Sequence, residues 1–98
     1  MIKILKNEDL KEVIKEGNYI VDFYADWCGP CQMMEPILEE LEGIDIIKVD
    51  IEEFENEAIE NGVMSIPTLI FFKDGKEVTR KIGFKSKEDI EEVIKTKL

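Results

Sequence analysis

Short apolar runs alternate with stretches of helical periodicity along this chain, and that alternation limits the fold more than any other feature. Residues 19–25 and 44–51 are dense apolar runs of strand length, typical of strands that are covered on both faces. Between them, apolar side chains recur at helical spacing from residue 34 to residue 41. Because strands that alternate with helices form parallel sheets with helices on both faces, we expect such a sheet here.

Signals for helix ends accompany this pattern. Asn7 and Gly17 are expected to cap and to end a helix with apolar positions at 10, 13 and 14, and Gly43 should end the helix that precedes it. Ser86 and Asp89 form a capping-box pattern that opens a last helix through residue 94.

A hairpin is expected near the end of the sheet. Asp74-Gly75 lies between the apolar runs 68–72 and 77–82, and Asp-Gly between such runs is the strongest short-range hairpin signal. With a short strand at 2–5 and a short helix at 54–60, the expected order is βαβαβαββα. The prediction is an α/β fold, a three-layer α/β/α sandwich with a mixed five-stranded sheet and four helices.

Length and charge narrow the class of protein. The 98 residues are too few for two cores, so we expect one domain over residues 1–98, and 44 % apolar residues can supply its core. The net charge of −10 argues against nucleic acid and against anionic lipid, because both require clustered Lys and Arg. With no signal peptide pattern and no run of about 18 apolar residues, we expect a cytoplasmic protein.

The two cysteines, Cys28 and Cys31, lie between an expected strand and an expected helix. A zinc site would need further ligands, and the chain has no histidine and no second cysteine pair. A purely structural disulfide closing about four residues would contribute only ~2 kcal/mol before ring strain. A Cys-x-x-Cys sequence in this context is instead typical of a redox motif.

The expected position at a helix start favours thiolate chemistry. Cys28 would face unpaired backbone N–H groups and the positive end of the helix dipole, both of which stabilise an anion. Pro30 fits the first helical position, where a missing N–H costs nothing. Cys31 would lie in the first turn, more covered than Cys28 but within bridging distance.

Two charged residues interrupt expected strands. Asp22 breaks an otherwise apolar run, and a carboxylate is costly to bury unless it is paired or neutral. It is either a solvated residue on a strand edge or a buried group with a chemical role. Lys48, as a lone strand lysine, would by itself be read as solvated.

The stretch Val21 to Cys31, which reads VDFYADWCGPC, resembles the signature of the thioredoxin family. Pro36, Lys48, the segment Ile66-Pro67-Thr68 and Gly83 fall where that family has matching residues, so the resemblance covers essentially the whole chain. It implies the thioredoxin fold and a thiol–disulfide oxidoreductase that reduces protein disulfides through a mixed-disulfide intermediate.

The resemblance also implies a role for each site residue. Cys28 would attack the substrate disulfide and Cys31 would resolve the mixed disulfide, with Asp22 as a buried proton acceptor for Cys31 and Lys48 as the partner of Asp22. A cis bond would precede Pro67, and the backbone of Ile66 would pair with an extended substrate segment. The expected apolar docking rim consists of Trp27, Gly29, Pro30, Ile66, Pro67, Gly83 and Phe84.

The implied redox group is the Cys28–Cys31 disulfide itself, with no metal or other cofactor. The implied partners are disulfide-containing proteins and a thioredoxin reductase that acts as electron donor, and the protein is expected to be a monomer. The chain departs from the commonest family pattern at Tyr24, Gln32 and Met64-Ser65. Two alternatives stay open: a non-catalytic partner subunit, and an oxidant or isomerase, which the Gly-Pro between the cysteines disfavours.

Overall fold

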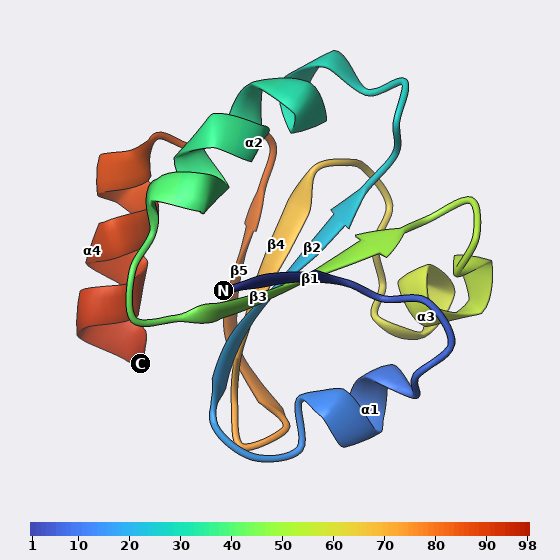
Figure 1. Cartoon of the computed structure of the whole chain (residues 1–98), viewed down its shortest axis with the longest axis horizontal. Helices are drawn as coiled ribbons and strands as arrows, with labels where there is room; N and C mark the ends of the chain where they lie inside the picture. The colour runs from blue at the N-terminus through green and yellow to red at the C-terminus, as the bar shows by residue number, and fades with distance from the viewer.

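The computed structural model describes all residues, 1–98, and shows a five-stranded sheet between two layers of helices (Figure 1). The sheet order is β1-β3-β2-β4-β5. The strands are β1 (Ile2–Ile4), β2 (Asn18–Tyr24), β3 (Asp45–Asp50), β4 (Thr68–Lys73) and β5 (Lys76–Ile82). The helices are α1 (Leu10–Val13), α2 (Gly29–Glu40), α3 (Glu55–Glu60) and α4 (Lys87–Lys97).

The sheet is mixed, as the sequence predicts. Strands β1, β3 and β2 run parallel, whereas β4 and β5 are antiparallel to their neighbours. At the β4–β5 turn both Asp74 and Gly75 have positive φ, 50° and 81°. Two consecutive positive φ values are what a two-residue type I′ hairpin requires, which explains the Asp-Gly pair.

Two apolar cores lie on opposite faces of the sheet because successive strand residues point in opposite directions. On one face, Leu10 of α1 and Ala58 of α3 pack with strand residues such as Val21. On the other face, Met34 and Leu38 of α2 and residues of α4 pack on strand positions such as Ile20. The three-layer prediction is therefore confirmed.

Local signals locate helix ends only in part. Ser86 caps α4 as expected, because its Oγ accepts a hydrogen bond from Asp89 N (3.1 Å). The expectation for the first helix is wrong at both ends: Asp9 rather than Asn7 caps it, and the helix ends at Val13 instead of reaching Gly17. Both Asn and Asp are good N-cap residues, so the sequence pattern does not choose between positions 7 and 9.

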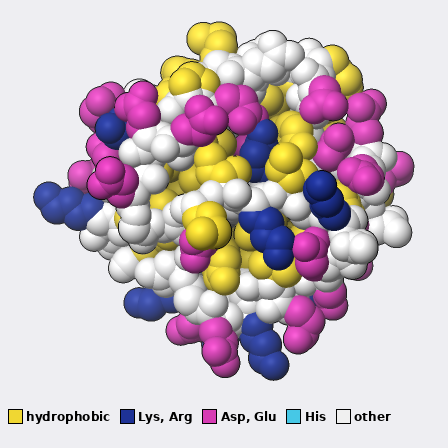
Figure 2. Space-filling model, viewed as in Figure 1, with side chains coloured by type: hydrophobic (Ala, Val, Ile, Leu, Met, Phe, Trp, Pro, Cys, Tyr) yellow, Lys and Arg dark blue, Asp and Glu magenta, His cyan; other side chains and the backbone are white.

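The molecular surface reflects the acidic composition. Asp and Glu side chains are spread around the visible face, with fewer Lys and Arg side chains between them (Figure 2). None of the four helices has the length and apolar character needed to cross a lipid bilayer.

Candidate active site

The cysteine pair lies where β2 leads into α2. Cys28 is the N-cap residue of α2, with an extended backbone at φ −83° and ψ 110°. The helix begins at Gly29, so Pro30 takes the second helical position, one later than expected. At that position an N–H still has no partner within the helix, so the proline costs no backbone hydrogen bond.

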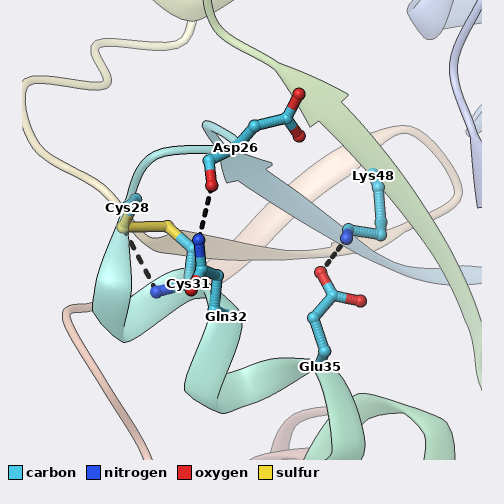
Figure 3. Close-up of polar contacts among 6 residues, drawn as sticks. All are labelled: Asp26, Cys28, Cys31, Gln32, Glu35 and Lys48. Atoms are coloured by element: carbon cyan, nitrogen blue, oxygen red, sulfur yellow. Dashed lines mark hydrogen bonds and ion pairs between the residues drawn. A yellow bond between two sulfur atoms is a disulfide. The ribbon is translucent and has the colours of Figure 1, made fainter.

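Cys28 and Cys31 form a disulfide, with their Cα atoms 5.2 Å apart (Figure 3). The backbone N–H of Cys31 donates a hydrogen bond to Cys28 Sγ at 3.2 Å. The first turn of α2 therefore directs an otherwise unpaired donor at the first sulfur. Such a donor favours negative charge on Cys28 when the disulfide is reduced.

The two cysteines are buried to nearly the same degree, with Cys28 4 % and Cys31 3 % exposed. The expectation that Cys31 is clearly more covered than Cys28 is therefore not met in the disulfide form. Both cysteines pack in one small apolar cluster with Tyr24 and Ala25, against which Ile66 also packs.

Hydrogen bonds brace the loop before α2. Cys28 N donates to Ala25 O (3.2 Å), and Gln32 Nε2 donates to Asp26 O (2.6 Å; Figure 3). Gln32 therefore ties the loop to the helix through a neutral side chain.

Asp22 is a buried carboxyl, not a solvated residue on a strand edge. It is 3 % exposed and lies in the central strand β2. It shares the α2 face of the sheet with Ile20, because residues two apart in a strand point the same way. Burial raises its pKa from 3.8 to about 7, with Lys48 lowering it and Glu35 raising it further.

Lys48 is buried as well, which corrects the interpretation of a lone strand lysine as solvated. It is the register partner of Asp22, yet its ammonium forms its ion pair with Glu35 of α2 (Figure 3). The same nitrogen lies 4.1 Å from the centre of the Tyr24 ring. Lys48 thus forms its ion pair with Glu35, while its charge still lowers the pKa of its register partner Asp22.

Glu35 is a site residue that the sequence did not predict. The available signal was its spacing: Glu35 follows Cys31 by four residues, which places both side chains on one face of the helix. That face is the one that also carries the buried residues Met34 and Leu38.

The expected docking rim gathers at one end of the sheet. Ile66 and Pro67 are joined by a cis peptide bond directly before β4. Gly83 N donates to Pro67 O (2.8 Å), so the end of β5 lies beside the start of β4. Because β2 is antiparallel to β4 and ends opposite Thr68, the cysteine loop emerges at this same end.

Exposure divides the rim residues. Trp27 is 65 % and Phe84 43 % exposed, large values for aromatic side chains, whereas Ile66 is half-buried and Pro67 buried. Met64, two residues before Ile66, is 96 % exposed and was not among the expected rim residues. None of the three cavities of the fold is lined by a cysteine; the largest, about 530 Å³, is lined by residues of α1, α3 and the β4–β5 hairpin, among others.

Comparison with known proteins decides what this arrangement is. The family model described as Thioredoxin matches residues 1–96. The chain belongs to the thioredoxin family. A thioredoxin from Chlamydia trachomatis is 44 % identical over 98 residues, 96 % of each chain. A thioredoxin from Staphylococcus aureus is 48 % identical over 91 residues, 88 % of each chain.

Solved thioredoxin structures share the fold. A mutant thioredoxin from Halobacterium salinarum superposes with a TM-score of 0.90 at 33 % identity, covering 98 % of this chain and 89 % of that one. Reduced thioredoxin from Schistosoma mansoni gives a TM-score of 0.87 at 32 % identity, covering 99 % and 98 %. The chain has the thioredoxin fold.

Family membership and the cysteine pair together establish the activity. The protein is a thiol–disulfide oxidoreductase that reduces protein disulfides. Its redox group is the disulfide itself, as in thioredoxins generally. As a thioredoxin it has disulfide-containing proteins as substrates and a reductase as partner. No group of three or more Cys, Asp or Glu side chains is arranged to hold a metal ion.

Proposed function

We propose that Cys28 is the attacking cysteine, Cys31 the resolving cysteine and Asp22 the proton acceptor of this thioredoxin. The single observation that carries the assignment is the hydrogen bond from the Cys31 N–H to Cys28 Sγ at the start of α2. It favours the thiolate on Cys28 rather than on Cys31, and the thiolate is the nucleophile in disulfide exchange.

The reaction then takes two steps. The Cys28 thiolate attacks one sulfur of the substrate disulfide, forming a mixed disulfide and releasing the other substrate sulfur as a thiolate, which takes a proton from water. Cys31 next gives its thiol proton to the Asp22 carboxylate and attacks Cys28 Sγ, releasing the second substrate thiolate. Two electrons pass to the substrate, and the Cys28–Cys31 disulfide remains.

The position of Asp22 suits the second step. Asp22 lies on the sheet face beneath α2, the helix that carries Cys31 on its buried side. A general base works best with a pKa close to the ambient pH, and burial raises that of Asp22 to about 7. The chain has no histidine that could take this role.

Substrate binding is proposed for the docking rim: Trp27, Gly29, Pro30, Ile66, Pro67, Gly83 and Phe84. Exposed aromatic side chains beside a buried reactive pair supply apolar contact area, and the backbone of Ile66 precedes β4 at an open end of the sheet. Such a surface fits an extended polypeptide segment, which binds through backbone hydrogen bonds and side-chain contacts.

We further propose that residues 1–98 form one domain that acts as a monomer in the cytoplasm, with a thioredoxin reductase as electron donor. The family match over residues 1–96 and the single sheet support one domain. A reductant of disulfides requires a reducing compartment to be maintained in its dithiol form, which supports the cytoplasm.

One experiment tests the reductase activity against the two alternatives that the sequence left open, an oxidant or isomerase and a non-catalytic binding subunit. The protein is equilibrated with glutathione buffers to obtain its reduction potential, and its dithiol form is mixed with a protein that has one accessible disulfide. A reductase should reduce that disulfide and have a potential near about −270 mV, the value known for thioredoxins, whereas an oxidant lies near about −120 mV. If the dithiol form, with both cysteines intact, fails to reduce the substrate at all, the result would favour the non-catalytic partner subunit.

A further inference from the structure

Three side chains from three elements meet on the α2 face of the sheet. Ile20 and Ile46 are register partners in the core under α2, and two residues further along each strand stand Asp22 and Lys48. Both therefore point to that same face. The Glu35 side chain extends from α2 to the Lys48 ammonium (Figure 3).

The three groups differ in their access to water. The side chain of Lys48 is 8 % exposed and Asp22 is 3 % exposed, whereas the side chain of Glu35 is 39 % exposed. The ion pair therefore lies at the margin of the buried cluster, with its carboxylate toward solvent. Contact with the Tyr24 ring, 4.1 Å from the ring centre to the Lys48 nitrogen, further restrains the ammonium.

We propose that Glu35 is a positioning residue for the Asp22 proton acceptor: by holding the Lys48 ammonium against α2, it keeps that cation from pairing with Asp22. The proposal rests on the function assigned above to Asp22. The buried Lys48 ammonium has two carboxyl neighbours, its register partner Asp22 and Glu35 of α2, and its ion pair is with Glu35, the more exposed of the two. Asp22 is left without an ion-pair partner, and that favours its protonated form.

The other groups around Asp22 do not replace the missing counter-charge. Its register partner on β4 is Leu69. Helix α2 contributes the buried Cys31 and, four residues on, the partly exposed Glu35, which is paired with Lys48. Tyr24, two residues further along β2, supplies no positive charge. Its pKa is raised by burial and by four nearby carboxyl groups, those of Asp50, Asp26, Asp22 and Glu35. The cation that lowers the pKa of Asp22 is that of Lys48.

Removing the charge of Glu35 should therefore act on Asp22 in two ways. Glu35 itself raises the pKa of Asp22, and that contribution disappears. The Lys48 ammonium, no longer held by α2, can move toward its register partner, and an opposite charge at short range lowers a carboxyl pKa. We expect the pKa of Asp22 to fall by roughly one unit.

The test is a titration of the oxidised protein, in which the disulfide cysteines do not titrate. The side-chain carboxyl carbon of Asp22 is followed by NMR against pH in the wild type, in Glu35→Gln and in Glu39→Gln. Glu39 is one turn further along α2 and exposed, which makes it the matched control. We expect the pKa of Asp22 to fall in Glu35→Gln and to stay at the wild-type value in Glu39→Gln. Equal pKa values in all three proteins would overturn the proposal.

Two further variants test the route of the effect. Glu35→Asp keeps the charge, so we expect the pKa of Asp22 to fall less in this variant than in Glu35→Gln. In a Lys48→Gln background the Glu35→Gln substitution should shift the Asp22 pKa markedly less, because the shared cation is gone. A full shift without Lys48 would overturn the claim that Glu35 acts through that lysine. If Glu35→Gln does not fold, Glu35→Asp in the wild-type and in the Lys48→Gln backgrounds carries the same test.

The kinetic arm separates this proposal from the function on which it rests. A mixed disulfide between Cys28 and a substrate is formed, and its release by Cys31 is timed against pH. In Glu35→Gln the midpoint of the release rate against pH should move to lower pH, by the same amount as the Asp22 pKa measured by NMR. An unchanged titration overturns the Glu35 proposal alone, whereas a shifted titration with an unmoved release profile overturns Asp22 as proton acceptor and, with it, the role of Glu35 in the reaction.

Discussion

The backbone N–H of Cys31 points at the Sγ of Cys28 from 3.2 Å, across the first turn of α2. The two residues are otherwise similar, both buried and both in contact with the same small apolar cluster. Their chemical difference therefore originates in their place on the helix, since Cys28 caps the N-terminus and Cys31 lies inside the first turn.

The first prediction concerns the two thiol pKa values in the reduced protein. Cys28 should titrate at least about one unit below Cys31, because helix N-terminal interactions contribute up to ~1 kcal/mol each and one unit corresponds to about 1.36 kcal/mol. A nearby Asp22 carboxylate would raise the pKa of Cys31 further and couple the titrations. Alkylation against pH, mapped by mass spectrometry, measures both thiols. Faster alkylation of Cys31 would reverse the assigned roles.

The second prediction separates attack from resolution. Cys28→Ser should abolish reduction of a protein disulfide, because no thiolate remains at the helix N-terminus. Cys31→Ser should instead accumulate a mixed disulfide between Cys28 and the substrate, because the resolving sulfur is gone. Non-reducing gels and intact-mass spectrometry detect the adduct. Normal turnover by Cys31→Ser, with a dithiol to recycle it, would contradict the two-step mechanism.

The third prediction is a pH-dependent gain in stability for Asp22→Asn in the oxidised protein. The folded-state pKa of Asp22, about 7, lies above the ordinary 3.8, so the folded form retains a proton that the unfolded form has lost. The contribution of the Asp22 carboxyl to the free energy of unfolding is thus fully present below about pH 4, and it is lost as the pH rises through about 7. About three units of difference correspond to a penalty on the order of 4 kcal/mol above pH 8.

The neutral isostere should therefore be more stable than the wild type at pH 8, with the difference shrinking toward pH 4. Because Lys48 pairs with Glu35, the substitution does not leave that cation unpaired. Urea denaturation at several pH values measures the difference, with Asp26→Asn, an exposed neighbour, as the control expected to stay within about 0.5 kcal/mol. A pH-independent difference would show that Asp22 is ionised with an ordinary pKa.

The fourth prediction tests the docking rim through Trp27. Trp27→Ala should raise KM for a protein disulfide several-fold but leave reduction of a small aromatic disulfide and the free energy of unfolding nearly unchanged, because the side chain is 65 % exposed. Val78→Ala is the matched control. Val78 is also exposed but lies in β5 toward the hairpin, away from the end where Thr68 pairs with Ile82. Equal losses toward both substrates would place Trp27 in the chemical step rather than in docking.

Local sequence patterns determined the element order and several turns. The Asp74-Gly75 hairpin and the Ser86 cap depend on a few neighbouring residues, so they can be read without the fold. The cysteine pair at a helix start belongs to the same class, because capping and the helix dipole act within one turn. The first helix shows the limit of such signals: Asn7 and Asp9 are equally good caps by residue type, and in the structure it is the Asp9 carboxylate that accepts from Lys11 N.

The tertiary structure alone decided how the charges of the site are shared. Asp22 and Lys48 were expected to pair, and their strands do place them side by side. The partner of Lys48 depends on how α2 lies over β3, which brings Glu35 within reach across 13 positions of sequence. The near-equal burial of the two cysteines likewise depends on side chains from β2 and from the loop before β4. No local pattern encodes these contacts, because each depends on the packing of elements that are distant in the chain.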